Sequence, residues 1–303
     1  MIENQVLPIA DHWRGRLENL IEKSHRDYID VNESVDWSVS VDRTRFPKRQ
    51  DHCWVYGTSY WQQTNAAQRL EMAWEETARD ISMFIWLEQA LPLLYLSYVA
   101  KYGRQLDAPV REYLMLFSKE EIVHTLMFRR YMANANLTLF GPPDGLQEFF
   151  SDTLRGMDPA LGVIATLLLE NVAEQGAVLG TVGDDNDALT RTIALTHHHE
   201  EARHLAFGRW IAESHLKKHG PGAADTMRPI LETYMSRLVR QYTFNTEIIG
   251  RLSFDLGVSA SDEDAISKIR KSDNNRKINE ERYGGMLAWL KKWSLVSPDY
   301  EWL

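Results

Sequence analysis

The chain has little of what several protein classes need. Its 303 residues include one cysteine, Cys53, so no internal disulfide can form. Lysine and arginine number 34 against 43 acidic residues, and the net charge of -9 disfavours a nucleic-acid partner, which requires a basic face. The longest apolar run, residues 161–169, is far short of the roughly 20 residues of a membrane span, and residues 1–15 contain no charged-then-apolar leader. We therefore expect a cytoplasmic protein with neither nucleic-acid nor membrane partners.

The composition that is present, 44% hydrophobic and 25% charged, is typical of a globular enzyme. Residues 9–29 have helical spacing, whereas residues 30–62 alternate Val, Trp and Ser around Pro47 and Gly57, which predicts an extended arm. From residue 64 onward the periodicity is helical almost throughout, with Gly or Pro at the ends of the main helices. The predicted helices cover residues 64–101, 107–136, 159–182, 186–218, 222–255, 260–272 and 276–292.

The order of these helices predicts an all-α fold. Four long helices within residues 63–218 indicate a four-helix bundle, with further helices from residues 219–303 packed around it. We expect residues 1–62 to form an N-terminal helix and arm that wrap this body. The whole chain, 1–303, is then a single domain.

A histidine-rich helix segment carries the first chemical signal. In it, His197, Glu201 and His204 have the pattern HxxxExxH, and at 100° per residue they fall within roughly 60° of one another. Two imidazoles and a carboxylate on one helix face make a metal-ligand geometry. Taken alone, the segment could equally be a solvated helix face.

A second pair, Glu121-x-x-His124, lies on the predicted helix 107–136. Helical carboxylate-bridged dimetal sites use one Glu-x-x-His pair from each of two helices and one Glu from each of the other two. Both remaining helices offer such an acid, since Glu88 and Glu170 stand in strongly apolar stretches where an unpaired carboxylate is costly. The ordered set, one motif per helix, rarely arises by chance.

Several neighbouring residues are ambiguous. Glu174, one turn after Glu170, could replace it as ligand or could hold a histidine ring nitrogen. Glu120 and Glu200 lie about 100° around their helices from the ligands, so we expect them to be exposed or salt-bridged. The others are His198 and His199, expected off the ligand face, and Asp80, which could support His124 or His204 or be an ordinary surface acid.

Carboxylate and imidazole ligands without thiolate favour iron, with manganese as the alternative. Glu121 and Glu201 are expected to bridge two metals. Glu88 and His124 complete one metal, Glu170 and His204 complete the other, and His197 adds a nitrogen to the second. Open positions remain for O2.

This ligand set resembles that of the diiron arylamine N-oxygenases, the p-aminobenzoate and chloramphenicol-pathway type, within the ferritin-like superfamily. The resemblance rests on Glu88, Glu121-x-x-His124, Glu170 and His197-x-x-x-Glu201-x-x-His204, and extends over about residues 60–250. It implies O2-dependent oxidation of an amine nitrogen to hydroxylamine, nitroso or nitro, with electrons from an external donor and a role in specialised metabolism. Most ferritin-like oxygenases have two histidine ligands, so His197 is the residue that narrows the family.

Alternatives remain open on the sequence. The same metal site could serve a C–H hydroxylase or desaturase. Two other hypotheses are a ferritin- or rubrerythrin-like iron-handling protein and a metal-free helical interaction protein. Neither the substrate nor the oligomeric state follows from the sequence, although a homodimer is compatible with it. An arginine such as Arg203, Arg240 or Arg251 could bind a substrate carboxylate.

Overall fold

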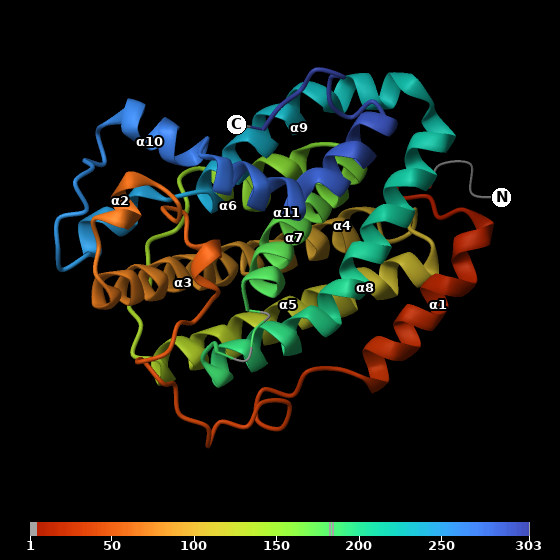
Figure 1. Ribbon diagram of the computed structural model, residues 1–303. Helices are drawn as coiled ribbons and strands as arrows, with labels where there is room; N and C mark the ends of the chain where they lie inside the picture. The colour runs from red at the N-terminus through yellow and green to blue at the C-terminus, as the bar shows by residue number, and fades with distance from the viewer. Residues whose placement is uncertain (1–4, 182, 184, 303) are drawn as a thin grey trace.

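The computed structural model describes residues 5–181, 183 and 185–302, and none of these residues lies in a β-strand. Four long helices form the central bundle of an all-α, ferritin-like fold, as predicted (Figure 1). They are α3 (Ala66–Glu88), α5 (Ala108–Asn134), α7 (Pro159–Thr181) and α8 (Ala188–His219). α7 packs along α8, and α5 packs against both α3 and α8.

Local signals in the sequence place the ends of these helices. Asn65 begins α3 with a capping box, in which its side chain accepts from the backbone N–H of Gln68 and Gln68 bonds back to the Asn65 N–H. The Asp187 side chain accepts from the backbone N–H of Thr190 at 2.8 Å and so begins α8. Gly220 ends α8 with a φ of 72°, a positive backbone angle that glycine adopts more readily than other residues. These caps fix the register of the helices that carry the chemistry.

The remaining helices cover the bundle. α1 (Asp11–Arg26) packs across α5 and α8, α4 (Ala90–Tyr102) packs along α5, and α9 (Pro221–Tyr242) and α11 (Asp273–Lys292) pack on α7. α1 lies at one end of the bundle, and the short helices α2 and α10 lie at the other (Figure 1). The shorter elements are α2 (Ser59–Gln62), α6 (Leu146–Glu148), α10 (Glu263–Arg270), the 3-10 turns Gln50–His52, Leu154–Gly156 and Thr246–Arg251, and the π-turn Phe149–Thr153.

The segment between α1 and α2 is the extended arm that the sequence predicted, and it follows the lower edge of the bundle in Figure 1. Backbone hydrogen bonds fasten it at its far end, from the Arg49 N–H to the Gly180 carbonyl at 2.7 Å and from the Asp187 N–H to the Phe46 carbonyl at 2.8 Å. Nearer α1, the Ile29 N–H donates to a carboxylate oxygen of Glu200 at 2.8 Å. The arm is therefore tied to α7 and to α8, the helix that carries the histidine-rich segment.

Two predicted helices are wrong in extent. The single helix expected over 64–101 is broken at Gln89, because Pro92 has no N–H and its ring excludes the carbonyl of residue 88, four positions earlier. The helix expected over 222–255 ends at Tyr242, where Thr243 becomes extended and Phe244 takes a φ of 49°. The first break leaves Glu88 at the end of α3.

Two helical stretches are long and apolar enough to cross a membrane by length and composition alone. They are Ala66–Tyr102 and Pro159–Thr181, and 61% and 78% of their most apolar windows are buried inside the protein. Burial of this kind is what core helices show, so these stretches are weak evidence for a membrane span.

Candidate metal centre

Seven acidic and histidine side chains from the four bundle helices meet in the core, and each is at most 4% exposed. They are Glu88 at the end of α3, Glu121 and His124 on α5, Glu170 on α7, and His197, Glu201 and His204 on α8. The structure thus brings together every ligand that the sequence predicted. Their convergence follows from helical spacing, because Glu-x-x-His and His-x-x-x-Glu each place both side chains on one helix face.

The seven residues form two groups that share Glu201. In each group the four ligand atoms all lie within 4.8 Å of one another, close enough to hold a metal ion. One group is Glu88, His124, His197 and Glu201, and the other is Glu121, Glu170, Glu201 and His204. Two metals sharing a carboxylate ligand therefore fit this arrangement.

The atoms that face the centre of the cluster lack well-aligned hydrogen bonds within the protein. They are both carboxylate oxygens of Glu88, Glu121 and Glu201, Oε1 of Glu170, Nδ1 of His124 and His204, and Nε2 of His197. Buried polar atoms are nearly always satisfied, and a cluster of unpartnered acids is costly without a cation. Carboxylate oxygens and imidazole nitrogens are also the donors that iron and manganese accept. The cluster fits two such metals.

In each histidine of the cluster, the ring nitrogen that faces away from the centre contacts a carboxylate outside the cluster. Nε2 of His124 lies 2.7 Å from Glu200, and Nε2 of His204 lies 2.8 Å from Glu120. Both acids are 1% exposed, and of the two expected alternatives, exposed or salt-bridged, the structure shows the second. Their position 100° around the helix does not lead to solvent, because α1 and the arm cover that side. A carboxylate in this place fixes the orientation of an imidazole ring and makes it more basic.

Arg203 holds these two outer acids in place. Its Nη2 lies 3.0 Å from Glu120 and 3.1 Å from Glu200, and its Nε donates to the Ser24 hydroxyl of α1 at 3.1 Å. The guanidinium thus faces away from the cluster centre, and it is not a substrate-binding group. Arg251 is likewise committed, since it donates to the carbonyls of Thr138 and Leu139. Arg240 lines a separate surface hollow with Thr246 and Arg270.

Glu174 supports a histidine and stands outside both groups. Its Oε2 accepts from Nδ1 of His197 at 3.1 Å, and its Oε1 is paired with Nδ1 of His198. Of the two candidates for the fourth carboxylate, Glu170 is the one within the cluster. His198 is half-buried and off the ligand face, as expected.

The grouping of His197 differs from the expectation, and the structure decides between the two alternatives left open for Asp80. The bond to Glu174 turns Nε2 of His197 toward Glu201, at 2.9 Å, and Glu88, at 3.2 Å. His197 therefore groups with Glu88 and His124 instead of with Glu170 and His204. Asp80 supports neither His124 nor His204, because it lies two turns before Glu88 and its carboxylate is 3.6 Å from Nζ of Lys48.

The electrostatics of the cluster reflect crowded buried acids. Burial raises the pKa of Glu88 to about 7 and raises the pKa of Glu170 well above its usual value. Burial alone would lower the pKa of His124, but the hydrogen bond to Glu200 and the carboxylate of Glu201 3.2 Å from Nδ1 outweigh it and raise that pKa to about 9. In the same way the bond to His204 overcomes burial and lowers the pKa of Glu120 to about 2. Burial likewise raises the pKa of Glu121, but His204 and His197 outweigh burial at Glu201 and lower its pKa well below the usual value. Glu88, Glu121 and Glu170 thus resist ionisation, whereas Glu201 and the outer acid Glu120 are held ionised.

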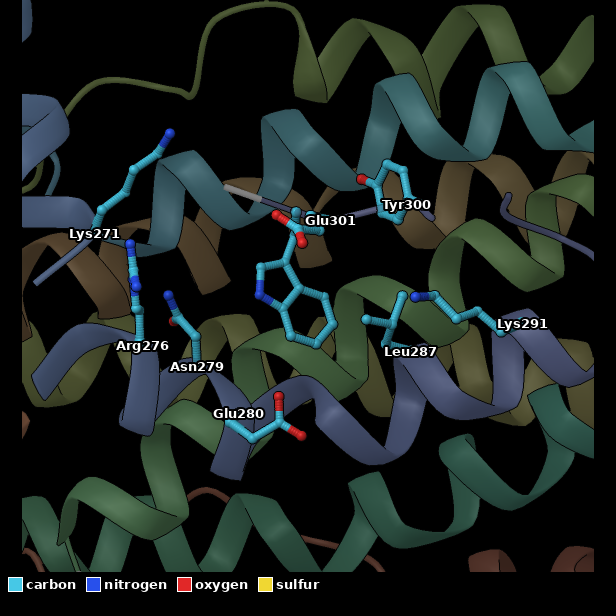
Figure 2. Close-up of a pocket in the computed structure, with 9 residues that line it drawn as sticks. Lys271, Arg276, Asn279, Glu280, Leu287, Lys291, Tyr300 and Glu301 are labelled. Carbon is cyan, nitrogen blue, oxygen red and sulfur yellow. The ribbon is translucent and has the colours of Figure 1, made fainter. Parts of the chain in front are cut away.

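A narrow, mostly apolar slot of about 40 Å³ reaches His197 from outside. Phe84 and Phe128 stack with ring centres 5.0 Å apart, and the His197 ring meets both edge-on. A larger hollow of about 500 Å³ lies beside α11, where Figure 2 shows Arg276, Glu280 and Lys291 around it. That hollow contains no residue of the cluster, whereas the lining of the slot includes His197.

The comparisons with known proteins agree with this geometry. The family model described as P-aminobenzoate N-oxygenase AurF matches residues 12–274, most of the chain and all seven cluster residues. No curated protein matches the chain.

Proposed function

Since the match spans residues 12–274, the chain belongs to the diiron p-aminobenzoate N-oxygenase family, and we propose that its seven-residue cluster is the site at which that chemistry occurs. Members of this family are O2-dependent oxidoreductases that use a diiron centre. In this protein Glu88, His124 and His197 would hold one iron, and Glu121, Glu170 and His204 the other. Glu201 belongs to both groups and is the natural bridge, whereas Glu121 falls in one of them.

The observation that carries this proposal is the set of inward-facing carboxylate oxygens and ring nitrogens that lack well-aligned hydrogen bonds and have one another as neighbours, with His–Glu distances of 2.9 to 3.2 Å. Three histidines are turned so that a bare ring nitrogen points to the centre, and each is held there by an outer acid. Ordinary buried salt bridges do not need such an arrangement, because their polar atoms satisfy one another. The same donor set would also accept manganese.

Bound iron would supply the site that activates O2 for transfer to a nitrogen. The protein's own contribution is to keep the ligands rigid, since Glu174, Glu120 and Glu200 hold the imidazoles, and Arg203 joins two of those acids. Phe84 and Phe128 exclude water beside His197 and offer an apolar wall to an aromatic amine. We propose a small arylamine as substrate, and an external redox partner as the source of electrons.

Product analysis tests the proposed activity. The iron-loaded, reduced protein is mixed with ¹⁸O2 and a panel of aromatic amines, and products are analysed by mass spectrometry. We expect labelled hydroxylamine, nitroso or nitro compounds. Label on a ring or alkyl carbon would instead identify a C–H hydroxylase on the same site, and an iron mineral without product would indicate iron handling.

We also propose a single domain located in the cytoplasm. The larger hydrophobic core includes residues from Leu7 to Val296, which joins the arm, the bundle and the covering helices in one body. Cys53 is a buried free thiol, which suits a reducing compartment.

A homodimer is the oligomeric state we propose. The helices α4 and α5 pack on each other, and five of their apolar side chains are at least 44% exposed. They are Leu93, Leu96, Met115, Ile122 and Leu126. Burying such side chains between two copies of the chain would stabilise an interface. Sedimentation equilibrium tests this, with Ile122→Lys expected to shift a dimer toward monomer; a monomeric parent protein would contradict it.

A further inference from the structure

The slot lies between the four bundle helices and extends along the bundle axis from the cluster. On α3, Asp80, Phe84 and Glu88 recur every fourth residue, so they share a face and Asp80 lies about 12 Å along the helix from Glu88. On α8, Thr190 and Ala194 precede His197 with similar spacing. The other two bundle helices contribute Phe128, Tyr131, Ala177 and Thr181. A molecule in the slot therefore has one end at His197 and the other near Asp80.

The outer end of the slot carries a charged group of three residues. Nζ of Lys48 lies 2.6 Å from Glu76 and 3.6 Å from Asp80. The side chains of Lys48 and Glu76 are 7% and 3% exposed, whereas that of Asp80 is 34% exposed. Glu76 also accepts from the Trp54 N–H at 3.0 Å. Lys48 and Asp80 both line the slot, whereas Glu76 does not. A bound molecule therefore meets Asp80 beside an ammonium that is already paired with Glu76.

Lys48 is held in this position by the arm. Its neighbour Arg49 donates its backbone N–H to the Gly180 carbonyl, which lies on the slot wall. The slot has room for only a few water molecules, so a ring can enter only when a lining side chain moves. Within this wall the ammonium of Lys48 lies opposite two carboxylates.

The charge balance at the outer end disfavours an anion. One lysine faces two acids there, and a substrate carboxylate would place a third negative charge beside a single ammonium in a poorly hydrated site. A neutral group adds no charge. A cationic group would pair with Asp80 and bring the outer end to neutrality.

Among the residues that the structure describes, no second lysine or arginine lines the slot, and the histidine in its lining, His197, lies at the inner end. The nearest candidate, Arg282, lies behind Gly176, where its Nη2 is 3.4 Å from the Gly176 carbonyl and 3.4 Å from Nδ1 of His52. Its guanidinium also stacks over the Trp54 ring. This arginine is therefore occupied away from the slot.

We propose that the slot selects slender aromatic amines whose end opposite the reacting nitrogen is neutral or positively charged, and that Asp80 together with Lys48 and Glu76 discriminates against carboxylates. This inference rests on the proposed function, because it takes the slot as the substrate site. The proposed substrate therefore differs from p-aminobenzoate, the compound in the name of the family, which carries a carboxylate opposite its amine.

The test uses three probes that share a ring and an amine and differ in the charge of the group opposite. They are 4-aminobenzoate, 4-aminobenzamide and 4-aminobenzylamine. Binding to the iron-loaded protein is measured by calorimetry without reductant, so that no turnover occurs. We expect the amide and the benzylamine to bind at least about tenfold more tightly than the benzoate, a difference of about 1.4 kcal/mol. Benzoate binding that equals or exceeds amide binding would overturn the proposal.

Asp80→Asn removes the discriminating charge while keeping the shape of the side chain. We expect it to reduce the preference for amide over benzoate at least about threefold, with the iron content unchanged. Asp299→Asn, at an exposed acid that does not line the slot, is the matched control and should retain the preference. An unchanged preference in Asp80→Asn would also overturn the proposal.

The outcome is separable from that of the proposed function. A preference for benzoate together with nitrogen oxidation contradicts only the charge rule. Selective binding without nitrogen oxidation contradicts the oxygenase activity and leaves the charge rule in place. Failure of all three probes to bind contradicts the slot as the substrate site and therefore this inference.

Discussion

Nδ1 of His197 lies 3.1 Å from Oε2 of Glu174, and this contact leaves Nε2 of the same ring between Glu88 and Glu201. The outer acid therefore decides which nitrogen the metal cluster receives. Glu120 and Glu200 stand in the same relation to His204 and His124. The cluster is a set of ligands inside a set of carboxylates that orient them.

Glu174→Ala should weaken iron binding about 10- to 100-fold, because the His197 ring loses the partner that orients it. Competition with a coloured chelator measures the affinity. His198→Ala is the control, since His198 is also paired with Glu174 but lies half-exposed outside the cluster. Equal affinities for the parent protein and Glu174→Ala would show that Glu174 has no orienting role.

Arg203→Met should destabilise the protein by about 3 kcal/mol, because it leaves the buried carboxylates of Glu120 and Glu200 without their shared cation. Urea unfolding of the metal-free protein measures the loss. Arg209→Met, at an exposed position on the same helix, is expected to change the free energy of unfolding by less than about 0.5 kcal/mol. A similar small effect in both variants would contradict the assigned role of Arg203.

Glu170→Gln should affect metal binding and stability in opposite directions. The substitution removes one of the four buried carboxylates of the seven-residue cluster, so the metal-free protein should melt at the same or a higher temperature. The iron content should fall from about two toward one per chain. Thermal melting and elemental analysis of one preparation measure both. Glu174→Gln is the comparison, because Glu174 stands outside both ligand groups; retention of both irons in Glu170→Gln would remove Glu170 from the ligand set.

His52 should make the metal-free protein sensitive to mild acid. Burial, together with the neighbouring Arg282, lowers its pKa from 6.5 to about 3. Because the folded state binds this proton more weakly than the unfolded state, stability is complete above about pH 6.5 and is lost as the pH falls toward 3, by up to about 1.4 kcal/mol per pH unit. Urea unfolding at pH 7 and pH 5 should show a smaller loss for His52→Gln than for the parent protein. Equal losses would contradict the prediction.

The sequence predicts which acidic and histidine side chains meet in the core, because each of them leaves a local mark in the sequence. Glu88 and Glu170 stand alone in apolar stretches, and the spacing in Glu121-x-x-His124 and around Glu201 fixes a helix face without knowledge of the fold. Those marks predict both the bundle and the residues in its core. The family match supports the same function independently.

What the sequence does not predict depends on what covers each helix. Helical periodicity places Glu120 and Glu200 100° from the ligands, but whether that face meets solvent depends on α1 and the arm, which are distant in sequence. The orientation of His197 likewise depends on Glu174 from another helix. A better signal was available for the break before α4, since Pro92 cannot continue a helix that includes residue 88.

The iron content of the purified protein tests the central claim most directly. After growth or reconstitution with iron, elemental analysis should find about two irons per chain. Glu201→Ala should bind at most one, because Glu201 is the residue that the two groups share. Absence of iron from the parent protein, with none taken up by the metal-free form, would contradict a diiron centre at these seven residues.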